Sequence, residues 1–155
     1  MDIEKIMQDI KEQENTLLFD KFDNFDALNI GLKLVDRAKV EGKTITIHIT
    51  LNRQVLFHFA FPGTTPNNES WISRKENTVY HFFQSSYYLE KQMELRNTTL
   101  KEHYGLSEDY VASGGGFPIN IKGIGVVGSI IVSGMKSYQD HQYVVDAITE
   151  YLGRK

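Results

Sequence analysis

The sequence predicts an α+β fold in which helices pack on a central antiparallel sheet. Residues 44–50 and 55–61 are two β-rich runs with a short polar segment between them, and the first alternates strictly between isoleucine and polar side chains. Residues 118–121 and 125–134 form a second such pair near the C-terminus. Each pair is expected to form a hairpin, and hairpin strands are antiparallel. Helical patterns before, between and after the two hairpins complete the α+β order.

Two helices are expected before the first hairpin. Residues 3 to about 15 carry isoleucine and methionine at helical spacing. A second helix is expected to begin after a cap at Asp23 or Asn24, because a short polar side chain there can accept a hydrogen bond from the first turn. It should end near Gly42, since glycine readily adopts the left-handed conformation that terminates helices.

The remaining helices are expected on either side of the second hairpin. Residues 67 to about 88 have the pattern of one long helix, and a further helical stretch is expected at about 89–103. The C-terminal helix should begin at Ser137, because Ser137 and Asp140 have the spacing of a capping box. Its buried stripe would consist of apolar residues one turn apart, namely Val144, Val145, Ile148 and Leu152.

Length and composition exclude several classes of protein. At 155 residues the chain fits one domain, residues 1–155, and it contains no cysteine, which excludes disulfides, thiolate metal sites and a cysteine nucleophile. The net charge is −3 and no cluster of lysine and arginine stands out, so we expect no nucleic-acid partner. The N-terminus lacks the pattern of a secretory signal, and the most apolar segment, residues 124–135, is about half the ~20 residues that span a membrane. We therefore expect a cytoplasmic protein without membrane contact.

Two histidines of the first hairpin, His48 and His58, raise the question of a metal site. With a loop of two or four residues, His48 would face Phe57 and His58 would face Ile47, so the imidazoles would lie on opposite faces of the sheet. Only an odd loop, such as one with a bulge, would place them opposite one another. Neither strand carries a carboxylate. We therefore expect no metal site here.

The segment of residues 70–86 is dense in functional side chains. On a helix its polar residues form one line beside an aromatic line, namely Ser70, Arg74, Asn77, His81 and Ser85. Trp71 stands one turn before Arg74 and Lys75. A cation beside an aromatic face can hold a carboxylate or a phosphate, or stack on a flat ring. The alternative is an exposed helix face whose basic side chains are merely solvated.

The second unusual segment is the turn Gly114, Gly115, Gly116, Phe117 and Pro118. Three consecutive glycines permit positive φ and allow a ligand to approach the backbone N–H groups closely. The turn lacks the Gly-Lys-Ser/Thr sequence of a phosphate-binding loop, and a strand rather than a helix follows it. A ligand-binding turn and a purely structural turn both remain open at this point.

Together these segments make the chain resemble a known family. The WxxRKxNxV run, the GGGFPI turn and the VSGM…QDHQYVVDAI ending are similar to those of the GlcG/HbpS-like haem-degrading domain family, in particular its small single-domain branch. The similarity spans about residues 16–152. It implies a profilin-like α-β-α layered domain with a central antiparallel sheet, homo-oligomers built from dimers, and haem binding in some members. The chain departs from the branch at Ser113, where a histidine often stands.

The resemblance implies a set of ligand-binding residues and leaves three hypotheses open. The carried-over residues are Trp71, Arg74, Lys75 and Asn77 on the helix and Gly114, Gly115, Gly116, Phe117 and Pro118 on the turn. The leading hypothesis is an oligomeric protein that binds a small anionic or planar ligand, with haem as the named candidate. In this hypothesis Arg74 and Lys75 hold the anionic group and Trp71 stacks on the ligand. One rival is an enzyme of haem breakdown or small-metabolite conversion, with His81 as its acid–base candidate, and the other is an assembly or adaptor protein without a small ligand.

Overall fold

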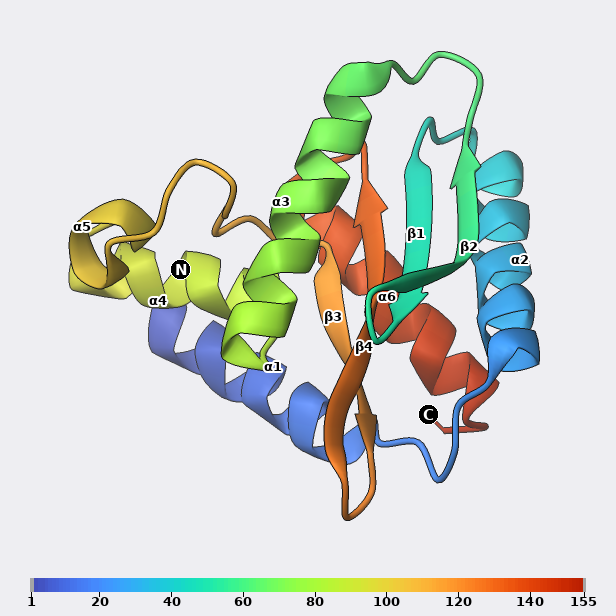
Figure 1. Ribbon diagram of the computed structural model, residues 1–155, viewed down its shortest axis with the longest axis horizontal. Coiled ribbons are helices and arrows are strands. Elements are labelled where there is room, and N and C mark those ends of the chain that lie inside the picture. The colour runs from blue at the N-terminus through green and yellow to red at the C-terminus, as the bar shows by residue number, and fades with distance from the viewer. Residues whose placement is uncertain (1, 155) are drawn as a thin grey trace.

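The two hairpins form one antiparallel sheet, which crosses the centre of Figure 1. A computed structural model describes residues 2–154. The four strands are β1 (Thr46–Leu51), β2 (Gln54–Ala60), β3 (Gly116–Ile121) and β4 (Gly125–Ser133). Their order in the sheet is β2-β1-β4-β3, and each neighbouring pair is antiparallel. The α+β prediction is confirmed.

Helices cover both faces of the sheet and give the expected α-β-α layers. α2 (Asn24–Glu41) and α6 (Ser137–Tyr151) pack on one face, and α3 (Pro66–Phe82) crosses the other (Figure 1). α1 (Ile3–Thr16) packs against α4 (Ser86–Arg96) at one side of these layers, and the short α5 (Leu100–Tyr104) continues from α4.

The two faces of the sheet differ in polarity because β1 alternates. Ile45, Ile47 and Ile49 are fully buried in the main apolar core, which lies between the sheet and the α2 and α6 layer. The other face of β1 carries Thr46, His48 and Thr50 and lies under α3. The layer between α3 and the sheet is therefore rich in polar groups, and its hydrogen bonds determine where functional side chains lie.

The prediction of a single helix at residues 67–88 is wrong, because the helical conformation is interrupted between α3 and α4. Phe83 adopts a left-handed conformation with φ 57°, and Ser85 caps α4 by accepting a hydrogen bond from the backbone N–H of Tyr88. Ser85 also donates two hydrogen bonds, from its backbone N–H and its hydroxyl, to the buried carboxylate of Glu14 in α1. A partner on a distant helix thus fixes the break.

Two other helix boundaries also differ from the prediction. The stretch expected at 89–103 is divided at Asn97, which has φ 52°, and Thr99 caps α5. α6 begins at Ser137 as expected, but the prediction that Ser137 and Asp140 form its capping box is wrong. The Gln139 side chain accepts from the backbone N–H of residue 136 instead, because the Asp140 carboxylate is used elsewhere.

Candidate functional site

Lys75, which was expected to hold an anionic ligand, lies in the protein interior. Its Nζ donates hydrogen bonds to Asp140 Oδ2 at 3.1 Å and to the carbonyl oxygen of Val132 at 3.0 Å, and the Lys75 and Asp140 side chains are each 2% exposed. Burial lowers the pKa of Lys75 and raises that of Asp140, while the ion pair opposes both shifts. Breaking such a pair by removing one partner costs about 3–5 kcal/mol. The first role of Lys75 is therefore to join α3 to the start of α6.

A shallow hollow of about 330 Å³ lies above this ion pair. Trp71 and Lys75 of α3 line it together with Ser113 from the chain before the glycine turn. The remaining lining residues come from the start of α3, the end of β4 and the start of α6, namely Asn67, Asn68, Ser133, Gly134, Met135 and Asp140. The structure thus brings two of the four expected helix residues together.

Arg74 and Asn77 face a different part of the molecule. The Arg74 guanidinium lies over the Trp71 ring at 4.8 Å, and its Nε donates to the carbonyl oxygen of Glu108 at 2.8 Å. Asn77 Nδ2 donates to the carbonyl oxygen of Asp109 at 2.9 Å. Both side chains therefore hold the segment after α5 against α3. They share no hollow with Lys75, since successive helix positions point in different directions.

The acid–base candidate His81 lies at the C-terminal end of α3. Its exposed ring packs edge-on against Phe82 at 4.8 Å and Tyr110 at 5.3 Å between ring centroids. It lies two turns beyond Arg74 on the helix and lines none of the hollows described in this section.

The glycine turn is packed tightly by the protein itself. Residues 114–118 are all buried. A Cβ at Gly114 would lie 2.4 Å from the Ser137 carbonyl oxygen and 2.7 Å from the Tyr87 ring, and one at Gly116 would lie 2.8 Å from Val79. Gly115 has φ 130°. The glycines therefore let neighbouring side chains of this chain approach the backbone.

A second hollow, of about 400 Å³, lies between α1, the C-terminal end of α2 and the start of α6. Its lining combines apolar and aromatic side chains with His141 and seven polar or charged groups: Ile6, Ile10, Tyr87, Met135, Tyr138, Tyr143, His141, Asp9, Gln13, Arg37, Glu41, Lys43, Gln139 and Gln142. The glycine turn supports its wall, because the Tyr87 ring packs against Gly114 and the ring centroids of Phe117 and His141 are 5.9 Å apart. We call this the His141 hollow.

His141 is a buried neutral imidazole with one unused nitrogen. Burial lowers its pKa from 6.5 to about 4. Its Nε2 lies 2.8 Å from Gln13 Oε1, an acceptor, so Nε2 carries the proton and Nδ1 carries a free lone pair. Within residues 2–154, Nδ1 has no hydrogen-bond partner. A buried polar atom without a partner calls for an explanation, and a bound ligand is one.

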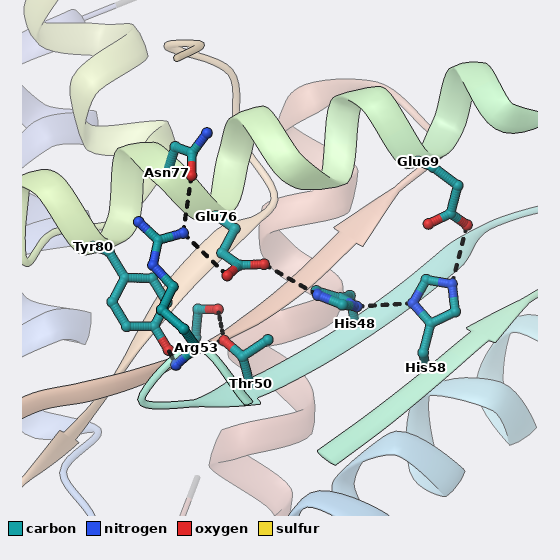
Figure 2. Close-up of polar contacts among 9 residues, drawn as sticks. His48, Thr50, Arg53, His58, Glu69, Glu76, Asn77 and Tyr80 are labelled. Atoms are coloured by element: carbon teal, nitrogen blue, oxygen red, sulfur yellow. Dashed lines mark hydrogen bonds and ion pairs between the residues drawn. The ribbon is translucent and has the colours of Figure 1, made fainter. Parts of the chain in front are cut away.

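The two hairpin histidines lie directly opposite one another, so their expected placement on opposite faces of the sheet is wrong. The β1–β2 register pairs His48 with His58, because a bulge shifts the register between Ile49 and Thr50. Figure 2 shows the two rings facing each other, with Nδ1 to Nδ1 at 2.8 Å. Their Nε2 atoms contact Glu76 and Glu69 of α3 at 3.1 and 3.0 Å.

The same network continues along α3 to the β1–β2 turn. Arg53 Nη1 donates to Glu76 Oε2 at 3.1 Å and to Asn77 Oδ1 at 2.9 Å, and its guanidinium lies over the Tyr80 ring at 4.2 Å (Figure 2). Thr50 Oγ1 lies 2.9 Å from the Tyr80 hydroxyl. This chain of contacts fixes the first hairpin against α3.

Sequence reasoning missed Glu69, Glu76 and Tyr80 as members of this network. A signal was available, because the three residues recur at spacings of seven and four on one face of the helix. The partners in the His141 hollow had no comparable signal, since Gln13, Tyr87 and His141 come from three distant segments.

No helix among residues 2–154 is long and apolar enough to cross a membrane. In the same part of the chain, no three or more histidine, aspartate or glutamate side chains are grouped so that they could hold a metal ion.

The sequence is similar to a family of haem-related proteins. The family model described as haem degrading protein HbpS-like matches residues 22–149. A UPF0303 protein of Serratia proteamaculans is 42% identical over 154 residues, which cover 99% of this chain and 96% of that relative. A UPF0303 protein of Streptomyces coelicolor is 38% identical over 146 residues, which cover 94% of this chain and 92% of that relative.

Solved structures share the fold at lower sequence identity. The crystal structure of the Ybr137w protein matches with a TM-score of 0.88 at 23% identity, covering 95% of this chain and 87% of that one. The crystal structure of the PduOC:Heme complex matches with a TM-score of 0.70 at 18% identity, covering 83% of this chain and 93% of that one. HbpS matches with a TM-score of 0.67 at 22% identity, covering 86% and 91%.

The packing of the glycine turn predicts the effect of Gly115→Val. A Cβ at Gly115 would lie 2.3 Å from the Val132 carbonyl oxygen and 2.7 Å from Lys75 Nζ. The substitution should therefore lower the free energy of unfolding by about 3 kcal/mol or more, measured by urea denaturation, because it combines positive-φ strain with damage to the ion pair. Gly123→Ala is the control: its φ is 76° but no atom lies within 4 Å, so a loss of about 1 kcal/mol is expected. Equal losses in the two variants would contradict this account.

The buried His141 predicts a specific pH dependence of stability. Above pH 6.5 the imidazole is neutral in both the folded and the unfolded protein. As the pH falls from 6.5 to about 4, the unfolded chain binds a proton that the folded protein excludes, so stability decreases by up to about 3 kcal/mol. Urea denaturation at pH 7 and pH 4.5 should show this loss in the wild type and a smaller one in His141→Gln. The same pH dependence in both proteins would show that His141 is not responsible.

Proposed function

The chain belongs to the HbpS-like haem degrading protein family, and from this premise we propose that it is a binding protein for a planar, anionic small ligand, with haem as the candidate. The observation that supports this most directly is the His141 hollow. It combines tyrosine rings, a histidine with a nitrogen that has no partner among residues 2–154, and the basic side chain of Lys43. Ligand pockets are typically apolar concavities with a few placed polar groups, and this hollow has that character.

The residues of the hollow fit the chemical parts of haem. An imidazole nitrogen is a common axial ligand of haem iron, and His141 Nδ1 has the free lone pair that this requires. The rings of Tyr87 and Tyr138 offer apolar faces, and Lys43 at the rim offers a cation for a propionate. Bound haem would supply an iron centre, whose reactivity depends on the polarity around it.

Access to His141 requires side-chain movement. Nδ1 has almost no solvent exposure, so a ligand reaches it only when side chains that line the hollow move aside. Tyr138 is 53% exposed at the start of α6 and is the wall residue with most freedom to do so. We propose that Tyr138 swings outward when the ligand enters.

The residues singled out in the sequence would extend this site. Met135 lines both the His141 hollow and the shallow hollow of Trp71 and Lys75, so the two hollows adjoin. A ligand too large for the first would reach the second past Met135. Trp71 would then stack on its exposed edge, while the glycine turn would support the wall without touching the ligand. Arg74 and Asn77 would act only through the loop that they hold.

The family similarity supports haem as the candidate ligand. The family description names haem, and a protein of the same fold has been solved as a PduOC:Heme complex. At 18% identity, the similarity to the PduOC:Heme complex shows only that the two proteins share a fold. The choice of haem as ligand therefore rests on the His141 hollow and the family description together.

A haem titration tests the proposal. Purified protein should show a saturable shift of the Soret band at micromolar haem, and His141→Gln should weaken binding by about 10-fold or more, because the axial nitrogen is lost. His81→Gln and His103→Gln are matched controls, since both histidines are exposed and neither lines the hollow. These two variants should bind haem like the wild type.

The same titration separates the alternatives. No saturable shift with folded protein would remove haem as the ligand. Loss of binding in His81→Gln but not in His141→Gln would move the site to the end of α3, where the enzyme hypothesis placed its acid–base group.

We further propose that the protein works as a homodimer built across α2 and β2. Phe25, Leu28 and Leu32 form an exposed apolar stripe at helical spacing on α2, and Phe25 is 73% exposed. Beside it, β2 is an edge strand of the sheet (Figure 1) and exposes Phe59 on the face that α2 covers. A two-fold axis would pair the same patch on both copies and cover the open edge.

Light scattering after gel filtration tests this dimer. The double variant Phe25→Glu/Leu32→Lys should elute as a monomer at concentrations at which the wild type is dimeric, because charges would be buried in the interface. Ile124→Lys, in the exposed turn between β3 and β4, should leave the wild-type mass unchanged. A monomeric wild type would refute the proposal.

A further inference from the structure

The facing histidines of the first hairpin form a cluster that the proposed ligand site does not use. His48 and His58 lie opposite each other on β1 and β2, with ring planes at 81° and Nδ1 atoms 2.8 Å apart. They lie under α3, on the face of the sheet away from α6 and His141 (Figures 1 and 2). This histidine pair is therefore separate from the proposed haem site.

The outer nitrogens determine which ring nitrogens carry protons. His48 Nε2 lies 3.1 Å from Glu76 Oε1, and His58 Nε2 lies 3.0 Å from Glu69 Oε2. An ionised carboxylate only accepts hydrogen bonds, so each Nε2 must be the donor. A neutral imidazole has a single N–H. Each Nδ1 therefore carries a lone pair, and the network directs these lone pairs toward each other.

Two facing lone pairs at this distance repel unless a cation lies between them. A proton can fill this place, and so can a metal ion. Carboxylates that accept a hydrogen bond from the far nitrogen of a histidine are the usual supports of metal-binding histidines, because they fix the tautomer and make the ligating nitrogen more basic. Here both histidines have such a support.

We propose that His48 and His58 form a binding site for a divalent transition metal ion, coordinated through both Nδ1 atoms. Imidazole nitrogens bind such ions at about 2.0–2.1 Å, so two nitrogens 2.8 Å apart subtend roughly 90° at the ion. This angle suits adjacent positions of a square-planar or octahedral ion and is narrower than the tetrahedral angle that zinc adopts. Copper(II) and nickel(II) have the fitting geometry, and copper(II) has the higher intrinsic affinity.

The surroundings suit a site with open coordination positions. The His58 side chain is 31% exposed and that of His48 is 13% exposed, so water or a small external ligand can complete the coordination. Glu69 and Glu76 place two negative charges next to the imidazoles, and Arg53 holds the second oxygen of Glu76 at 3.1 Å. The metal would thus join the hairpin and, through the carboxylates, α3.

Calorimetric titration of the chelator-treated full chain with copper(II) and nickel(II) chloride tests the proposal. We expect one ion per chain, with copper bound more tightly than nickel. His48→Gln and His58→Gln should each weaken binding by about 10-fold or more, and Glu69→Gln, which leaves both ligands in place, should weaken it less. His81→Gln and His103→Gln control for adventitious binding by exposed histidines and should match the wild type.

An independent readout uses only the wild-type protein. The electron paramagnetic resonance spectrum of the copper complex should show a tetragonal ion with hyperfine structure from two imidazole nitrogens. Stoichiometric binding that persists in folded His58→Gln, or a copper spectrum without two nitrogen ligands, would overturn the proposal. Failure of both ions to bind would also overturn it and would leave a shared proton as the cation of the pair.

Discussion

The buried ion pair between Lys75 and Asp140 is the interaction on which the rest of this structure depends. It joins α3, on one face of the sheet, to the start of α6, on the other, and the Val132 carbonyl of β4 completes the contact. Only glycine fits at position 115, because φ is 130° and a Cβ would lie 2.3 Å from the Val132 carbonyl oxygen and 2.7 Å from the ammonium. The pair therefore contributes to the need for glycine at position 115. It also explains why the Asp140 carboxylate does not form the predicted capping box with Ser137, since its oxygens accept from Lys75 Nζ and from the backbone N–H of Met135.

The polar face of the sheet follows from the same constraint. Beneath α3, next to the buried lysine, the strands present mainly threonine, serine and histidine, with Ile131 of β4 as an apolar exception. Polar groups buried in this layer need partners, and the network from Glu69 to Arg53 provides them for His48, His58 and Thr50. The hydroxyl of Thr46, on the same face, has no partner among residues 2–154. In contrast, the face under α2 and α6 is apolar and needs no such network.

The two proposed sites divide between these faces. The His141 hollow lies beside the apolar layer, where burial keeps the imidazole neutral and leaves Nδ1 without a partner. The hairpin histidines lie in the polar layer, where carboxylates fix their protons. One histidine is thus suited to an apolar planar ligand and the other pair to a hydrated ion. Sequence similarity to the HbpS-like family supports only the first of these assignments.

The sequence by itself determined the features that depend on neighbouring residues, namely the two hairpins, the α+β class and the end of α2 at Gly42. It limited the cap of α2 to Asp23 or Asn24, and the structure has Asp23. Periodicity and capping act within a few residues, so they can be read directly. Tertiary structure alone decided the helix break at Ser85, because Ser85 donates hydrogen bonds to Glu14 of the distant helix α1. It also decided the burial of Lys75, because the ammonium pairs with Asp140 of α6. The facing histidines depended on a bulge in β2 that no local pattern marks. The carried-over residues of α3 divide between a loop contact, made by Arg74 and Asn77, and the shallow hollow of Trp71 and Lys75, because helix positions with adjacent numbers point in different directions.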